Sequence, residues 1–352
     1  MRVRGLGRLR RIWRWATAPL RSEAEAVILL YHRVFEAPVD PQLLCVTPQN
    51  FSAHMEHLQR RYRVLSLEEL RRGILEGTVP KRAVVVTFDD GYADNLWNAR
   101  PILERCGVPA TVFVAAGYVG QELEFWWDEV ERLLLHPGRV PRTLRMDLDG
   151  GVYEWDLGDA AEYTTAEFER HRGWHVLMKG DPTPRHRAYR ELCRLMRPLP
   201  DAERRRVLDG LREWAGVDGK ARWDYRPLSR PELLELTRDR LVEVGSHTLS
   251  HPVLSALSLE EQHREISESK ATLEAVLGRP VVHFAYPYGS PADYTSETVA
   301  LVREAGFEGA CSNFAGTVSA GRGLDLYQLP RFLVRNWTGE EFARRLARWF
   351  RE

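Results

Sequence analysis

The sequence predicts an α/β protein built on a mainly parallel β-sheet with helices on both faces, either open or closed into a barrel. Apolar runs of strand length recur along the chain, beginning with Ala26–His32, Ala83–Asp90 and Ala110–Ala116. Segments with helical spacing of apolar residues separate these runs. Strands that are covered on both faces have continuous apolar sequences. Strands that alternate with helices usually pair in parallel, because each crossover returns the chain to the same end of the sheet.

Two helices in the first third of the chain carry clear end signals. Thr47 and Pro48 mark the start of the first, since a Thr side chain caps free N–H groups and Pro fits the first helical turn. Its apolar residues follow at helical spacing, at Phe51, Met55 and Leu58. The second helix is expected over Asn95–Cys106, and Gly107 ends it.

The α/β pattern resumes after residue 240. We expect strands at Leu241–Ser246, Val281–Tyr286 and Tyr327–Val334. A helix is expected at Leu259–Leu277, and a final helix after Thr338. The helix Leu259–Leu277 has the clearest start, because Ser258 and Glu261 form a capping box.

Residues 121–225 interrupt the alternation, and we interpret them as a helical insertion on the α/β scaffold, with a lid as one role open to it. The segment is rich in tryptophan, at Trp126, Trp127, Trp155, Trp174, Trp214 and Trp223. Tryptophan at helical spacing usually belongs to a hydrophobic core, which is the interpretation we favour. The alternative is that some of these rings are exposed and stack on sugars.

Composition restricts the class of protein. The 352 residues include 50 Lys and Arg and 50 Asp and Glu, so the formal net charge is zero. Such a chain lacks the globally basic surface with which many proteins bind nucleic acid. No apolar run reaches the roughly 18 residues that a membrane-spanning helix needs. These properties are typical of a soluble globular enzyme.

Two features bear on the location of the protein. The four cysteines are far apart and form no paired motif, which favours a reducing compartment but leaves two long-range disulfides open. Residues 1–22 contain seven arginines and no acidic residue, without the continuous apolar stretch of a secretory signal. This basic arm either contacts an anionic membrane peripherally or packs as a surface arm. A cytoplasmic or membrane-peripheral location is therefore expected.

Two acidic residues stand at the end of the second apolar strand. Asp89 and Asp90 belong to the sequence TFDDG at residues 87–91, and parallel α/β folds bind ligands at such strand ends. Adjacent carboxylates repel one another and lose solvation there. A metal ion on one of them relieves the repulsion and leaves the other free as a base. The alternative is a turn in which Asp90 caps the next helix.

Two histidines follow a later strand at metal-ligand spacing. If residues 247–251 (HTLSH) form a helical turn, His247 and His251 lie on one face and can bind one ion. Two histidines and one aspartate form a facial triad that leaves coordination positions open. We favour a divalent metal site over the alternative of two capping or core histidines.

Two further strand ends carry candidate residues. Pro287 and Gly289 indicate a sharp turn that can aim a backbone N–H at a developing oxyanion, although such turns are common. His32 ends the first strand and is a candidate general acid, because imidazole titrates near neutrality. The alternative for His32 is a structural hydrogen bond to the backbone.

Together these clusters resemble the polysaccharide deacetylases, carbohydrate esterase family 4, also called the NodB-type homology domain. TFDDG looks like the first family motif and HTLSH like the second, while AYPYG at 285–289 stands in the place of the third, R-P-P-Y-G. The resemblance implies a deformed (β/α) barrel of about seven units. Its catalytic domain is expected over residues 23–352, interrupted by the insertion 121–225.

The resemblance also implies residue roles. Asp89 corresponds to the general base, and Asp90, His247 and His251 correspond to the metal ligands. The backbone amide of Tyr288 corresponds to a donor of the oxyanion hole. The implied cofactor is a divalent ion, which we expect to be Zn²⁺.

Two family positions differ in this chain. Ala285 stands where the third motif has an arginine that orients the base, and Arg331 is our candidate substitute. Most members carry the general acid in a late Leu-x-His motif, but no histidine follows His283. The subgroup of exopolysaccharide and poly-N-acetylglucosamine deacetylases instead has an early Tyr-His pair, which Tyr31 and His32 match. His32 is therefore the candidate acid.

The expected function is metal-dependent hydrolysis of N-acetyl groups on the amino sugars of a polysaccharide or oligosaccharide. Two alternatives remain open. One is deacetylation or deformylation of a lipid-linked sugar, which the basic arm would suit. The other is an inactive scaffold that binds metal or glycan: Ala285 gives it weak support, but the presence of both aspartates and both histidines argues against it. The sequence predicts no oligomeric state.

Overall fold

The computed structural model of the chain describes residues 26–148, 150–319 and 324–351. The basic arm expected at residues 1–22 therefore lies outside the described residues. Among the helices that are described, none has both the length and the apolar character needed to cross a bilayer.

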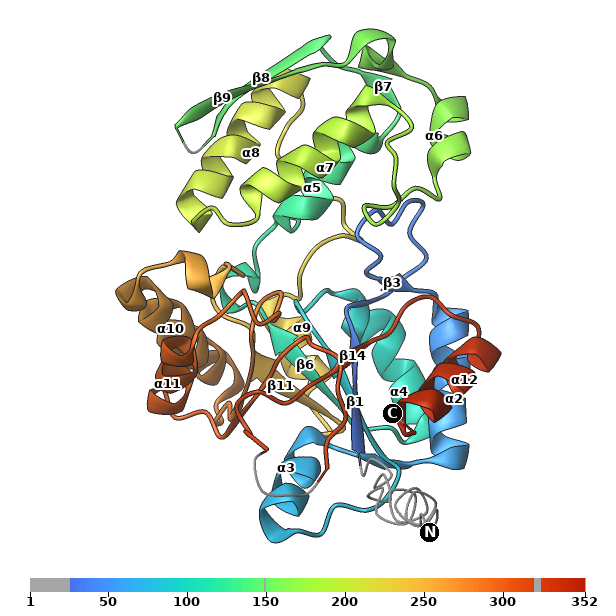
Figure 1. Cartoon of the computed structure of the whole chain (residues 1–352), viewed down its shortest axis with the longest axis vertical. Coiled ribbons are helices and arrows are strands. Elements are labelled where there is room, and N and C mark those ends of the chain that lie inside the picture. Colours follow the sequence, from blue (N-terminus) through green and yellow to red (C-terminus); the bar gives the residue numbers. More distant parts are fainter. Residues whose placement is uncertain (1–25, 149, 320–323, 352) are drawn as a thin grey trace, which may run out of the picture.

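The core of the fold is a parallel sheet that curls into a half-barrel (Figure 1). The strand order is β13-β12-β11-β6-β5-β1-β14, and β4 pairs with β5 beside this path. The strands are β1 (Ala26–Tyr31), β4 (Arg63–Leu65), β5 (Ala83–Phe88), β6 (Ala110–Val114), β11 (Val242–Ser246), β12 (His283–Ala285), β13 (Gly309–Cys311) and β14 (Phe332–Leu333). A separate short pair joins β2 (Arg33–Val34) to β3 (Cys45–Val46). The predicted α/β class with a parallel sheet is confirmed.

The last strand is shorter than expected. We expected a strand over Tyr327–Val334, but only β14 is regular. The reason is that this segment bonds both edges of the sheet: Leu329 pairs with Cys311 of β13, and Phe332 then pairs with Leu29 of β1. A segment that crosses between two edges cannot remain in one ladder. The same crossing brings the edges together, as in a deformed barrel.

Helices surround the sheet, and the start signals predicted at Thr47, Ser258 and Thr338 are present. They are α2 (Pro48–Arg61), α3 (Leu67–Glu76), α4 (Arg100–Cys106), α9 (Arg230–Leu236), α10 (Leu259–Leu277), α11 (Ser296–Glu304) and α12 (Gly339–Trp349). Thr47 caps α2 by accepting the Asn50 N–H, and the Ser258–Glu261 capping box is formed at α10. The helix expected over Asn95–Cys106 begins as a π-helical turn, η1 (Asn95–Ala99), before α4.

The residues that we interpreted as an insertion form a body beside the half-barrel, at the top of Figure 1. It contains α5 (Trp126–Leu135), α6 (Thr165–His171), α7 (Pro184–Met196), α8 (Asp201–Ala215), the hairpin β8 (Thr143–Leu148) with β9 (Gly151–Asp156), and the pair β7 (Gly138–Arg139) with β10 (Glu162–Tyr163). The segment is therefore not purely helical. Four of its tryptophans are buried, at positions Trp126, Trp127, Trp155 and Trp174, whereas Trp223 is 80% exposed.

The four cysteines are buried free thiols, so the disulfides left open by the sequence are not formed. Burial raises the pKa of the Cys193 thiol to about 12, and burial likewise raises the pKa of Cys45. Protonated, buried thiols behave as small apolar core residues.

Candidate active site

The predicted site residues follow the carboxyl ends of neighbouring strands. Asp89 and Asp90 come directly after β5, and His247 comes directly after β11. Tyr288 lies shortly beyond the end of β12. Since all these strands are parallel, their carboxyl ends meet at one edge of the half-barrel, where ligand sites of such folds are found.

Asp90, His247 and His251 converge as a set of possible metal ligands. One ligand atom from each residue lies within 4.8 Å of the other two, and all three residues are buried. Asp90 Oδ1 lies 3.3 Å from His251 Nε2 and 3.7 Å from His247 Nε2. His247 Nδ1 lies 2.8 Å from the Ala285 carbonyl oxygen. With its proton donated there, the ring presents the free Nε2 lone pair to the cluster, as metal-binding histidines do.

The chemistry of this cluster fits a cation. Asp90 Oδ1 is buried and accepts no hydrogen bond, which is costly for a carboxylate unless an ion satisfies it. Burial lowers the pKa of His247 to about 4 and the pKa of His251 to about 3, so both rings are neutral near pH 7. Neutral imidazole is the form that binds metal.

The loop that carries the two histidines is not helical. We expected residues 247–251 to form a helical turn, but Thr248 and His251 have left-handed backbone angles, with φ of +67° and +55°. The Thr248 hydroxyl accepts the His251 N–H at 3.1 Å and stabilises this turn. The histidines therefore meet Asp90 through a tight loop. The prediction that residues 247–251 form a helical turn was wrong, although the two histidines do converge.

Left-handed backbone conformations are concentrated at the carboxyl ends of the barrel strands. Seven non-glycine residues in the described ranges have positive φ, and four of them belong to the clusters above: Asp90, Thr248, His251 and Tyr288. Such conformations cost about 1–3 kcal/mol each and persist where the surrounding structure enforces them. No sequence pattern that we used indicated this strain.

Asp89 is held by Arg331. The two guanidinium NH₂ groups donate to the two carboxylate oxygens at 2.7 and 2.8 Å, and both side chains are buried. Burial is the largest single influence and would raise the pKa of Asp89, but the charge and hydrogen bonds of Arg331, together with the charges of His247 and His32, outweigh burial and lower this pKa. The Asp89 carboxylate is thus ionised, oriented and ready to accept a proton.

Tyr288 occupies a strained turn beside His251. Its φ is +60°, and no described residue accepts its backbone N–H. The turn requires glycine at the next position, because a Cβ on Gly289 would lie 2.8 Å from the backbone N of Asn313. The Tyr288 ring contacts the His251 ring, with centroids 4.7 Å apart. An unpaired N–H next to the ligand cluster is what an oxyanion donor requires.

His32 is half-buried at the end of β1. Burial lowers its pKa, while the nearby charges of Asp90 and Asp89 partly oppose that shift. Among the described residues, none hydrogen-bonds to its ring, so the structural bond considered as an alternative is not formed. The His32 ring is therefore under the electrostatic influence of both carboxylates, and no hydrogen bond within the described residues holds it.

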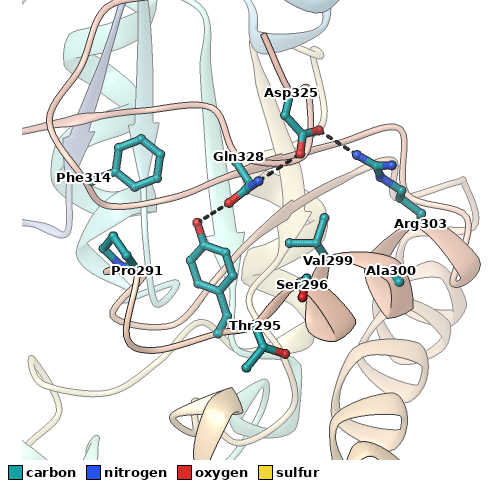
Figure 2. A pocket seen from close by; sticks show the side chains of 10 residues that line it. Pro291, Thr295, Ser296, Val299, Ala300, Arg303, Phe314, Asp325 and Gln328 are labelled. Carbon is teal, nitrogen blue, oxygen red and sulfur yellow. Dashed lines mark hydrogen bonds and ion pairs between the residues drawn. The ribbon is translucent and has the colours of Figure 1, made fainter. Parts of the chain in front are cut away.

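One surface cavity lies away from these residues. A pocket of about 580 Å³ lies at the start of α11, and Figure 2 shows that some of its lining side chains are joined by hydrogen bonds and an ion pair. Gln328 bridges Tyr294 and Asp325, and Asp325 pairs with Arg303. None of the predicted site residues lines this pocket, so we do not assign the chemistry to it.

Side chains from residues 121–225 also contact the ligand cluster and the neighbouring Tyr288, and the sequence did not indicate which side chains these would be. The Trp127 ring packs edge-on against His251, with centroids 5.0 Å apart. Arg197 lies over the Tyr288 ring at 4.3 Å. The Arg204 guanidinium donates hydrogen bonds to backbone carbonyls of the histidine loop, residues 247–251. One signal for Arg204 was present: it shares a helix face with the apolar Leu208 and Leu211.

Comparison with known families identifies related sequences. The model of the family described as polysaccharide deacetylase matches residues 76–140 and 215–310. YxkH of Bacillus subtilis is 30% identical over 115 residues, which cover 32% of this chain and 40% of that protein. Poly-β-1,6-N-acetyl-D-glucosamine N-deacetylase of Staphylococcus aureus is 31% identical over 114 residues, covering 29% of this chain and 39% of that protein. The alignments thus span about two fifths of these relatives.

Solved structures share the fold over nearly the whole chain. IcaB from Ammonifex degensii superposes with a TM-score of 0.56 at 18% identity, covering 94% of this chain and 98% of that one. Streptococcus pyogenes deacetylase PplD, solved in complex with acetate, gives 0.55 at 18% identity, covering 91% and 96%. At this level of identity the likeness concerns the fold. It confirms the predicted deformed (β/α) barrel.

Proposed function

Because the chain belongs to the polysaccharide deacetylase family, we propose that it removes N-acetyl groups from the amino sugars of a glycan by metal-dependent hydrolysis. The catalytic groups in this proposal are Asp89, His32 and the Tyr288 amide, with Arg331 as the residue that orients the base. The metal ligands are Asp90, His247 and His251.

The observation that carries the proposal is the buried pair of Arg331 and Asp89. Ala285 replaces the arginine of the third family motif, which favoured an inactive scaffold. Arg331 supplies a bidentate guanidinium to the same carboxylate from a different strand segment. A scaffold has no need for an ionised, oriented carboxylate beside a ligand cluster, whereas a hydrolase needs one as its base.

Two imidazoles and one carboxylate suit Zn²⁺, and we propose it as the native ion. A divalent ion bound there polarises the amide carbonyl and makes a water molecule more acidic. This role agrees with the buried, unsatisfied Asp90 Oδ1 and the neutral histidines described above.

Two side chains and one backbone amide then carry out separate parts of the reaction. Asp89 accepts the proton of the attacking water, and its contact with Arg331 keeps it ionised until then. The Tyr288 N–H donates to the carbonyl oxygen as negative charge develops on it. His32 donates a proton to the leaving amine; the lowered pKa of its ring makes the protonated form a stronger acid for this step.

For the substrate we propose a polymer or oligomer of N-acetylglucosamine. The support is the similarity to the S. aureus relative, whose name specifies the β-1,6-linked polymer. A lipid-linked amino sugar remains the second substrate class to include in any assay.

The test is product analysis by mass spectrometry with the full-length chain. Metal-stripped and Zn²⁺-restored protein is incubated with β-1,6-linked and β-1,4-linked N-acetylglucosamine oligomers and with a lipid-linked N-acetyl sugar. We expect each deacetylated sugar of a soluble oligomer to lose the mass of one ketene unit. This loss should occur only with the Zn²⁺-restored protein. Loss of carbon monoxide from a formylated analogue alone would indicate a deformylase. No product from any substrate with metal-loaded protein would contradict the proposal.

A further inference from the structure

A buried arginine from the segment 121–225 reaches the loop that carries the histidines. Arg204 lies on α8 and is 1% exposed. Its Nη2 donates to the Ser250 carbonyl at 2.9 Å, and its Nη1 donates to the His251 carbonyl at 3.1 Å. The contact joins the segment 121–225 directly to the backbone of a proposed metal ligand.

The Arg204 charge is poorly compensated. Its closest carboxylate oxygen, on Asp201, is 3.9 Å away, and its Nε is buried without a hydrogen-bond partner. A buried cation without a close counter-ion is expensive. By contrast, Arg212 on the same helix pairs with both oxygens of Glu129 at 2.7 Å. The hydrogen bonds to the two loop carbonyls must therefore offset most of the free-energy cost of burying the Arg204 charge.

A carboxylate holds the same loop from the other side. Glu265 on α10 accepts the N–H groups of Leu249 and Ser250, both at 2.9 Å, and the Ser250 hydroxyl at 2.7 Å. Hydrogen bonds to charged groups are stronger than neutral ones. The N–H groups of Leu249 and Ser250 are thus bonded to an anion from the barrel, and the carbonyls of Ser250 and His251 to a cation from the segment 121–225. This arrangement explains how His251 keeps its left-handed backbone.

We propose that Arg204 is a positioning residue that fixes the His251 backbone, so that residues 121–225 set the affinity of the site for its metal. The inference rests on the proposed metal site. The segment 121–225 then has a defined task besides any contact with glycan: without its guanidinium, the loop relaxes and the His251 ring loses its alignment with Asp90.

The test is the metal affinity of the full-length protein, measured without substrate. The metal-free chain and its Arg204→Met variant are titrated with Zn²⁺ in competition with a chromophoric chelator, and the Co²⁺ forms are compared by their absorption spectra. We expect Arg204→Met to bind about 10- to 100-fold more weakly, as for other groups that orient a ligand. We also expect an altered Co²⁺ spectrum.

Two arginines serve as matched controls. Arg185 is equally buried in the segment 121–225 and also donates to carbonyls, including those of Ala160 at 2.6 Å and Gly138 at 2.7 Å, but none of its partners belongs to the histidine loop. Arg205 neighbours Arg204 but is exposed and pairs with Asp201. Arg185→Met and Arg205→Met should keep the wild-type affinity.

Each outcome decides the inference. Wild-type affinity and spectrum in Arg204→Met would overturn it, and so would an equal loss in Arg185→Met, which would indicate general loosening. If Arg204→Met does not fold, Arg204→Lys decides instead: it keeps the charge but reaches only one carbonyl well, so its affinity should lie below wild type. Wild-type affinity in that variant would overturn the inference. A wild-type chain that binds no metal would instead contradict the proposed function itself.

Discussion

Replacing Arg331 with methionine should destabilise the protein far more than replacing an exposed arginine. Arg331 is buried, and its guanidinium neutralises the buried Asp89 carboxylate through bonds of 2.7 and 2.8 Å. In Arg331→Met the carboxylate remains in the barrel without its counter-ion. The Ser312 carbonyl also loses its bond to Arg331 Nε at 2.6 Å.

The expected loss follows from that geometry. Removing one member of a buried ion pair costs about 3–5 kcal/mol, because the remaining charge stays buried. This is a large share of the roughly 5–15 kcal/mol that stabilises a typical domain. The exposed pair of Arg345 and Glu341 on α12 provides the control: Arg345→Met should cost no more than about 1 kcal/mol.

The assay is urea unfolding of a double-mutant cycle. Asp89→Asn alone leaves Arg331 buried without a counter-ion and should destabilise strongly. In the Arg331→Met background the same change removes an uncompensated charge and should restore stability. The two substitutions must therefore be strongly non-additive. If Asp89→Asn costs the same free energy in both backgrounds, the pair is not coupled and the reasoning is refuted.

Three further predictions concern other residues. In His32→Gln, the profile of kcat against pH should lose its alkaline limb, because no acid remains to protonate the amine; an unchanged limb would assign the acid to another group. Burial raises the pKa of Asp128 to about 7, so the native state favours its protonated form and loses stability as pH rises through that value. In urea titrations Asp128→Asn should therefore gain stability relative to wild type as the pH rises from about 4 to about 7, and the difference should level off above pH 7; a constant difference over that range would argue against the shift. In Gly117→Ala, the new Cβ would lie 2.8 Å from the Leu249 carbonyl oxygen, which should cost roughly 1–3 kcal/mol and weaken metal binding. Gly180→Ala, with open space around it, should change neither stability nor binding.

Local sequence was sufficient to find the candidate residues that follow strands. Asp89, Asp90 and His247 each follow a continuous apolar run, and the parallel sheet then brings strand ends together wherever they occur in the chain. Helix boundaries such as Thr47 and Ser258 were likewise predictable, because capping depends on neighbouring residues.

Long-range and strained features were not predictable from local pattern. Arg331 and Asp89 are 242 positions apart, and only the departure from the third family motif drew attention to Arg331. The loop at His251 departs from helical geometry because Thr248 bonds the His251 N–H and Arg204 and Glu265 bond the loop from outside. The spacing of the two histidines carries no information about these distant partners.

The most direct test of the account is acetate release by Asp89→Asn at a measured metal content. Asp89 is proposed to accept the proton of water but not to bind the ion, so the variant should keep the wild-type amount of Zn²⁺ per chain. Its turnover on an N-acetylglucosamine oligomer should fall by about 100-fold or more, the usual contribution of a general base. Wild-type turnover in a folded, zinc-loaded Asp89→Asn protein would contradict the central claim that Asp89, held by Arg331, is the base.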